Sequence, residues 1–177
     1  HGGTGRNSLR ASARHRGHDM ASRDAGSAGS TSDAVASGVD EWHRVVATRD
    51  ASLLAGLLAD DAVFYSPVVF RAQEGKALTT MYLAGAMQVL GNDTFTYVRE
   101  VVAGHDAVLE FTSQVDGVTV NGVDMIRFDD AGRIVEFKVM LRPLKGIEKV
   151  RERMAELLAQ LSAGGDSDPA ETGRADP

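Results

Sequence analysis

The chain has 177 residues, with 25 acidic and 19 basic side chains and a formal net charge of -6 at pH 7. This balance argues against broad nucleic-acid binding, which needs clustered Lys and Arg side chains to neutralise phosphates. The sequence has no cysteine, which excludes disulfides, thiolate nucleophiles and Cys-based zinc sites. We recognise neither an apolar run long enough to cross a bilayer nor a secretory leader. We therefore expect a cytoplasmic protein without nucleic-acid or membrane partners.

The two ends of the chain differ in composition from its middle. Residues 1–33 contain no Val, Ile, Phe, Tyr or Trp, and such a segment cannot offset the entropy that it loses on ordering. We predict a disordered N-terminal extension over 1–33, one domain over 34–162 and a disordered acidic tail over 163–177. Because the chain begins with His1 and a methionine stands at position 20, residues 1–19 are a candidate for sequence outside the natural protein.

The first half of the predicted domain has helical patterns. Apolar residues from Val35 to Val46 follow the spacing of one helical face, and a later group before Gly91 does the same. A short run of leucines between them indicates another helix, and a run rich in aromatic residues indicates a strand that ends at a proline. The predicted elements are helices that start at Ser32 or Asp33, at Asp50 and after Gly75, and a strand over 62–67.

From Thr94 the apolar period switches from the helical value to two, which predicts strands. Short turns join these strands, so we expect an antiparallel meander. A final segment, from Ile147 to Leu161, has apolar residues at three-and-four spacing and predicts an amphipathic helix. The order predicts an α+β fold in which a curved antiparallel sheet packs against N-terminal helices, with one helix at the C-terminal end. The predicted strands are 94–103, 107–115, 118–128 and 134–141.

The strand predicted over 118–128 carries a carboxylate on its apolar face. Alternate side chains of a strand point to the same side, which places Asp124 with Val120 and Ile126. A buried carboxylate must be neutralised, paired or hydrogen-bonded, and such groups are over-represented at sites of chemistry. Asp124 is therefore a candidate acid or base. The structural alternative is that Asp124 accepts hydrogen bonds from backbone amides or pairs with an arginine such as Arg142.

The turns on either side of this strand predict the neighbours of Asp124. The Asp-Gly pair at 116–117 is a strong two-residue hairpin signal, and it places Asp124 opposite Leu109. A four-residue loop after the strand places Asp124 opposite Phe137. A rival Asn-Gly turn at 121–122 would keep the same facing, but we prefer the first turn because it leaves longer ladders.

These elements resemble a known family. The helices, the strand Phe64-Tyr-Ser-Pro67 and the hairpin Gly122-Val-Asp-Met-Ile-Arg127 to Gly132-Arg-Ile134 are similar to the SnoaL-like branch of the nuclear transport factor 2-like (NTF2-like) superfamily. The resemblance covers roughly 34–162. It implies a cone of helices and curved sheet with a pocket inside, and it implies that the acidic residue at the position of Asp124 is functional.

The function that this resemblance implies is broad. Members of the family resemble one another while serving as polyketide cyclases, ketosteroid isomerases, epoxide hydrolases, dehydratases and non-catalytic binding or assembly modules. The resemblance also implies a homodimer, which we expect to form through the outer sheet face that carries Val123, Met125 and Met140. This chain differs from the best-known members because its apolar sheet face shows no clear second carboxylate and no histidine.

Several other side chains are candidates for the same site. Tyr65, Tyr82 and Tyr97 are possible donors to a developing oxyanion, because a buried tyrosine hydroxyl usually finds a polar partner. We prefer Tyr82, which lies on the apolar face of the third predicted helix. We therefore predict Asp124 and Tyr82 as the catalytic pair. The predicted substrate-binding residues are Trp42, His43, Tyr65, Met81, Leu109, Ile126 and Phe137.

Two functions remain open at this stage. The first is a cofactor-free isomerase, cyclase, dehydratase or hydrolase in which Asp124 exchanges a proton with a small, apolar, oxygenated metabolite. The second is a non-catalytic ligand-binding or assembly module. We expect no metal and no cofactor, because no histidines have metal-ligand spacing on a defined element and no Gly-rich phosphate loop is present.

Overall fold

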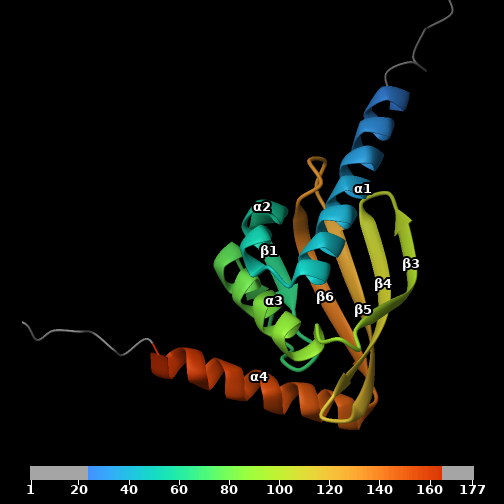
Figure 1. The fold of residues 1–177 in the computed structure, drawn as a ribbon. Helices are drawn as coiled ribbons and strands as arrows, with labels where there is room; N and C mark the ends of the chain where they lie inside the picture. Colours follow the sequence, from blue (N-terminus) through green and yellow to red (C-terminus); the bar gives the residue numbers. More distant parts are fainter. Residues whose placement is uncertain (1–23, 165–177) are drawn as a thin grey trace, which may run out of the picture.

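The computed structural model describes residues 24–164 and has the predicted α+β architecture (Figure 1). A curved six-stranded sheet is covered on one face by α1 and α3, and α4 crosses its lower end in the view of Figure 1. Within the described residues, no helix combines the length and apolarity needed to span a membrane. The elements are α1 Asp24–Thr48, η1 Ala51–Leu53, α2 Leu54–Leu57, β1 Leu58–Tyr65, β2 Gln73–Glu74, α3 Lys76–Leu90, β3 Thr96–Ala103, β4 Asp106–Val115, β5 Val118–Phe128, β6 Ile134–Arg142 and α4 Leu144–Gly164.

The first helix is longer than the sequence indicated. It begins at Asp24, so residues 24–33 are helical instead of belonging to the expected disordered extension. Extending an existing helix costs much less than nucleating one, because each added residue gains one hydrogen bond. Residues 1–23 lie outside the described residues, as does most of the predicted acidic tail, since α4 ends at Gly164.

The second helical segment is shorter than predicted, because the chain turns into a strand at Leu58. Leu58 pairs with Ile134 of β6 in a parallel arrangement, and this long-range pairing outweighs the local helical pattern of leucines. The strand then ends at Tyr65, before the predicted end. Because β1 runs parallel to β6, the sheet is mixed and not wholly antiparallel as predicted. Its four C-terminal strands form the expected antiparallel meander in the order β6-β5-β4-β3.

The register of β5 is correct on one side and shifted on the other. The turn at 116–117 has positive φ at both residues and places Asp124 opposite Leu109, as predicted. The rival turn at 121–122 is wrong, because β5 continues through both positions. Towards β6 the ladder is shifted by two residues, so Asp124 lies opposite Val139 and not Phe137. One residue of the shift arises at the loop, because Phe128 pairs with Ile134 instead of Arg133, and the other arises at an irregularity between Arg127 and Phe128. Such a bulge places two residues of one strand against one of its partner, which the regular ladder assumed from sequence does not contain.

Gly122 shapes the inner face of β5 beside Asp124. A Cβ atom at this position would lie 2.3 Å from Phe111 Cζ and 2.6 Å from Leu141 Cδ2. Both neighbours come from the flanking strands, and Phe111 is buried. The absence of a side chain at Gly122 therefore leaves room for the Phe111 ring above this position.

We predict that Gly122→Ala lowers the free energy of unfolding by about 1–3 kcal/mol, because overpacking forces core side chains off their preferred rotamers. Urea denaturation followed by circular dichroism measures this change. Thr119→Ala, at an exposed position of the same strand, serves as the control and should change stability by no more than about 0.5 kcal/mol. Equal stability of Gly122→Ala and wild type would show that Phe111 can move without cost.

Candidate functional site

Asp124 lies at the centre of the sheet and is almost completely buried, with 5% of its surface exposed. Leu109 and Val139 lie beside it on the neighbouring strands, and both are buried aliphatic residues. Their side chains offer no hydrogen bond to a carboxylate. The burial predicted for Asp124 from the strand alternation is confirmed.

A chain of two hydrogen bonds connects Asp124 to β3 and α1. The Tyr97 hydroxyl donates to Asp124 Oδ2 over 2.8 Å, and Trp42 Nε1 donates to the Tyr97 hydroxyl over 2.8 Å. The direction of the chain follows from its chemistry, because an indole N–H can only donate. Trp42 thus leaves the Tyr97 proton directed at the carboxylate.

The apolar surroundings change the acidity of both groups. Burial raises the pKa of Asp124 to about 7, and the hydrogen bond from Tyr97 partly opposes this effect by stabilising the carboxylate. Burial raises the pKa of Tyr97 well above 10, and the charge of Asp124 adds to the shift. Tyr97 therefore stays a neutral donor, while Asp124 is present in both protonation states near neutral pH.

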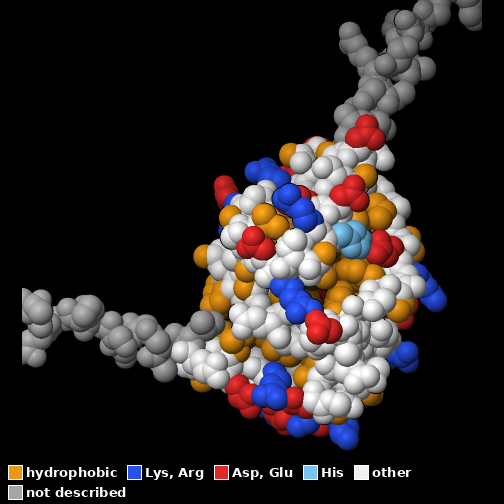
Figure 2. Space-filling view, in the orientation of Figure 1, with side chains coloured by type: hydrophobic (Ala, Val, Ile, Leu, Met, Phe, Trp, Pro, Cys, Tyr) orange, Lys and Arg blue, Asp and Glu red, His pale blue; other side chains and the backbone are white. Residues whose placement is uncertain are grey.

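Asp124 borders a small cavity with a volume of about 40 Å³, which we call the inner cavity. Its wall is apolar apart from the three hydrogen-bonded side chains of Trp42, Tyr97 and Asp124. Asp124 Oδ1 has no hydrogen-bond partner. In the described part of the chain, every fully buried side-chain oxygen or nitrogen has a partner, so Oδ1 is not fully buried. Oδ1 is therefore the oxygen that contacts the cavity. Figure 2 shows hydrophobic side chains gathered in a hollow between α1 and β3.

A larger cavity, with a volume of about 170 Å³, lies between α3, α4 and the segment after β1. We call it the outer cavity. Ala86, Leu90 and Val139 line both cavities, so the two are neighbours that share one wall. The outer cavity is largely apolar, and Arg151 is the one charged residue among those that line it.

The predicted donor Tyr82 does not contact Asp124. It lines the outer cavity, where its ring stacks on Phe64 with centroids 5.7 Å apart. Tyr97 holds the place beside Asp124 that we expected for Tyr82. The sequence favoured Tyr82 because it lies on the apolar face of the third predicted helix. A regular hairpin from Ala103 would place Tyr97 opposite Thr112 on the outer face. A bulge near Val98 instead places Tyr97 opposite Phe111 on the inner face.

The predicted substrate-binding residues separate into two groups. Trp42 and Phe137 line the inner cavity. The other five lie elsewhere. Leu109 and Ile126 are buried in the core, Met81 is 37% exposed, Tyr65 lies under the Lys138 ammonium, and His43 is paired with Glu100. The His43 ring contacts the edge of Tyr97 with centroids 5.2 Å apart, so it supports the site from outside the cavity.

Comparisons with known proteins agree with this architecture. Residues 39–137 match the family model of the SnoaL-like domain, and the chain belongs to this family. No curated protein matches the sequence. Among the described residues, no group of three or more His, Asp or Glu side chains is arranged to hold a metal ion.

Several solved structures are similar to this chain. The chain is 41% identical to a steroid delta-isomerase from Pseudomonas aeruginosa, with a TM-score of 0.70, and the match covers 73% of this chain and 95% of that one. It is 30% identical to a bacterial protein with a cystatin-like fold from Silicibacter pomeroyi, with a TM-score of 0.66 and coverage of 71% and 88%. An NTF2-like protein from Mesorhizobium loti, at 24% identity and a TM-score of 0.55 over 63% and 93% of the two chains, shares the fold.

We predict that Asp124 makes the folded state less stable as pH rises from about 4 to about 7. The pKa of this carboxyl is near 3.9 in an unfolded chain and about 7 in the folded protein. The folded state therefore binds the proton more tightly, and this stabilisation is lost across that range. At about 1.4 kcal/mol for each pKa unit, the loss is on the order of 4 kcal/mol.

The measurement is the free energy of unfolding of wild type and Asp124→Asn from pH 4.5 to 8.5. All other titrating groups are common to the two proteins, so the difference isolates Asp124. We expect the wild type to lose stability relative to the variant up to about pH 7 and to run parallel to it above pH 8. A difference that is constant, or that favours the wild type with rising pH, would contradict the raised pKa.

Proposed function

We propose that this protein is a cofactor-independent enzyme that moves a proton on an apolar, oxygen-bearing small molecule, with Asp124 as the acid and base. One observation carries the proposal: a carboxyl group with a pKa of about 7 exposes its free oxygen to an apolar cavity. General acid-base catalysis works best when the pKa of the catalytic group is close to the working pH. Burial against aliphatic side chains supplies that pKa here.

The reaction best suited to this arrangement is the shift of a double bond next to a carbonyl group. Ionised Asp124 takes a proton from the carbon between the carbonyl and the double bond, and the electron pair moves onto the carbonyl oxygen. Protonated Asp124 then returns the proton to the far carbon of the former double bond as the carbonyl reforms. The proton and electrons balance without a redox partner.

Tyr97 has two roles in this scheme. While Asp124 is ionised, the hydrogen bond from Tyr97 stabilises the carboxylate and keeps Oδ1 directed at the cavity. Once Asp124 has taken the proton, its carboxyl is a weaker acceptor, and the Tyr97 hydroxyl becomes available to donate to the oxyanion of the substrate. Trp42 orients the hydroxyl throughout, so it is a positioning residue.

The comparison with known structures supports this reaction class. The relative at 41% identity is a steroid delta-isomerase, and the match covers nearly all of that protein. The Phe and Val side chains of the inner cavity suit the carbon skeleton of an apolar ketone. We therefore extend the proposal to apolar ketones that carry a β,γ double bond, with steroids among them.

A second candidate is a binding module of the same fold. The inner cavity is small, and the chain from Trp42 to Asp124 leaves Asp124 Oδ1 as its free polar atom. A site with these properties can recognise one oxygen atom of a ligand without reacting with it. Turnover and binding experiments separate the two functions.

We predict that Asp124→Asn loses turnover by at least about 100-fold, because an amide cannot accept and return the proton. The assay follows the absorbance of the conjugated ketone formed from β,γ-unsaturated ketones, steroidal and non-steroidal, together with deuterium uptake from D₂O by NMR. Asp61→Asn, exposed on β1, is the matched control and should retain wild-type activity.

The pH profile provides the second test of the same role. Wild-type kcat/KM should rise through an inflection near pH 7 as Asp124 ionises. Tyr97→Phe should move this inflection upward, since it removes the hydrogen bond that lowers the pKa of Asp124. Full activity of Asp124→Asn would refute the catalytic role. Ligand binding without turnover or deuterium uptake, unchanged in Asp124→Asn, would favour the binding module.

We also propose that the protein forms a homodimer through the outer sheet face. Val101, Val108 and Met125 are direct cross-strand neighbours there and are 55%, 38% and 40% exposed. Met140, which is 53% exposed, lies opposite Val123 and extends this apolar row onto β6. Apolar groups that are contiguous on a surface mark interaction sites more often than scattered ones.

Met125→Lys should convert such a dimer into monomers, because it buries an unpaired charge in the middle of the apolar row. Sedimentation velocity at micromolar concentration measures the change. Leu144→Lys adds the same charge at an exposed position at the start of α4 and should leave the dimer intact. A wild-type protein that sediments only as a monomer would contradict the interface.

A further inference from the structure

We propose that the outer cavity is a second subsite of the same binding site, and that Arg151 there binds a negatively charged group at the distal end of the ligand. This inference rests on the proposed function only in that the reacting end of the ligand lies at Asp124. It assigns the ligand class more narrowly: an elongated apolar molecule with an oxygen at one end and a carboxylate, sulfonate or similar anion at the other.

The adjacency of the two cavities is the first argument. They share a wall formed by Ala86, Leu90 and Val139. A row of aromatic rings also runs from one cavity to the other. Trp42 and Phe137 line the inner cavity with ring centroids 4.7 Å apart, Phe64 lies 6.2 Å from Phe137, and Tyr82 stacks on Phe64 in the outer cavity. A flat apolar molecule can contact aromatic faces along this whole row.

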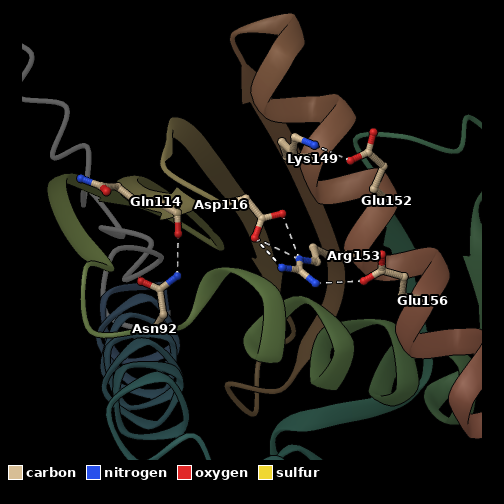
Figure 3. Close-up of polar contacts among 7 residues, drawn as sticks. All are labelled: Asn92, Gln114, Asp116, Lys149, Glu152, Arg153 and Glu156. Atoms are coloured by element: carbon tan, nitrogen blue, oxygen red, sulfur yellow. Dashed lines mark hydrogen bonds and ion pairs between the residues drawn. The ribbon is translucent and has the colours of Figure 1, made fainter.

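The charge of the outer cavity is the second argument. Arg151 is its one charged lining residue. Among the side chains that the structure describes, Arg151 has no partner at hydrogen-bond or ion-pair distance, and it acts on Glu152 only as a nearby charge. Its neighbours on α4 are engaged differently, as Figure 3 shows: Lys149 pairs with Glu152, and Arg153 pairs with both Asp116 and Glu156. A guanidinium with free donors at the edge of an apolar cavity matches a planar anion.

The placement of α4 is the third argument, because Arg151 can recognise a ligand only if its helix is held against the cavity. Arg153 fastens α4 to the turn between β4 and β5 through hydrogen bonds of 3.1 and 3.0 Å from its Nε to the two oxygens of Asp116 (Figure 3). On the other side, Met154 packs so closely on Gly85 of α3 that a Cβ there would lie 3.0 Å from its terminal methyl. Arg153 and Met154 follow Arg151 by two and three residues, so these contacts hold the turn of α4 next to it.

Two fluorescent dyes test the subsite without requiring turnover. 1-Anilinonaphthalene-8-sulfonate is flat, apolar and anionic, and N-phenyl-1-naphthylamine has the same ring system without the sulfonate. Titrations at fixed salt compare wild type with Arg151→Gln, and with Lys145→Gln, an exposed cation of the same helix that does not line the cavity. Ala155→Trp fills the outer cavity from the exposed side of α4.

We expect Arg151→Gln to weaken binding of the sulfonate about tenfold, the usual effect of losing a hydrogen bond to a charged group, and to leave binding of the neutral dye unchanged. Lys145→Gln should change neither, and Ala155→Trp should weaken both. Equal losses of sulfonate binding in Arg151→Gln and Lys145→Gln would indicate only a general attraction of the anion to the positive charges of α4, and would overturn the proposal. So would unchanged sulfonate binding in Arg151→Gln, or unchanged binding of both dyes in Ala155→Trp.

The same titration in Asp124→Asn keeps this proposal separate from the catalytic one. Asp124 lines the inner cavity and not the outer one, so this variant should bind the sulfonate as wild type does. If turnover is absent but the dye pattern holds, the subsite stands without the enzyme function. If turnover depends on Asp124 but the dye pattern fails, the enzyme function stands without the anion subsite.

Discussion

The hydrogen bond from Tyr97 to Asp124 is the contact on which the site depends. It joins β3 to β5 across β4, and the hydrogen bond from Trp42 extends the connection to α1. The carboxylate has no other polar partner among the described residues. Without the tyrosine, Asp124 would face only apolar groups, and its ionised form would be much less accessible. With the tyrosine, both protonation states exist near neutral pH, which is the property that proton transfer requires.

In the same apolar environment, Asp124 lowers the stability of the folded protein. An aliphatic residue between Leu109 and Val139 would need no hydrogen bond and would carry no charge at any pH. The surrounding core compensates, since the residues packed around the site include Phe111 and Phe137, both nearly fully buried. The site is therefore a polar group held in a rigid apolar frame, which limits its freedom to relax when its charge changes.

Sequence reasoning succeeded where regular geometry governs and failed at the bulges. The strand β5 and its pairing with β4 follow from simple alternation and from an Asp-Gly turn with positive φ at both residues, so the burial of Asp124 was predictable. Irregularities then changed its neighbours: a longer loop together with one bulge replaced Phe137 with Val139, and a second bulge turned Tyr97 inward. Neither bulge has a local sequence signal as strong as a turn, and a single extra residue reverses the facing of everything beyond it.

These bulges have a chemical consequence beyond register. A regular β3 would direct Tyr97 to the outer face and leave the carboxylate without its donor. Continued without its bulge, the pairing of Phe128 with Ile134 would place Lys138 opposite Asp124 in place of Val139, which lines both cavities. The irregularities thus place the Tyr97 donor beside Asp124 and bring Val139 into the wall that the inner and outer cavities share. The hydrogen-bond donor to Asp124 and the wall shared by the two cavities arise from the same departures from an ideal sheet, so a chain with the same alternation but no bulges would have the fold without this arrangement.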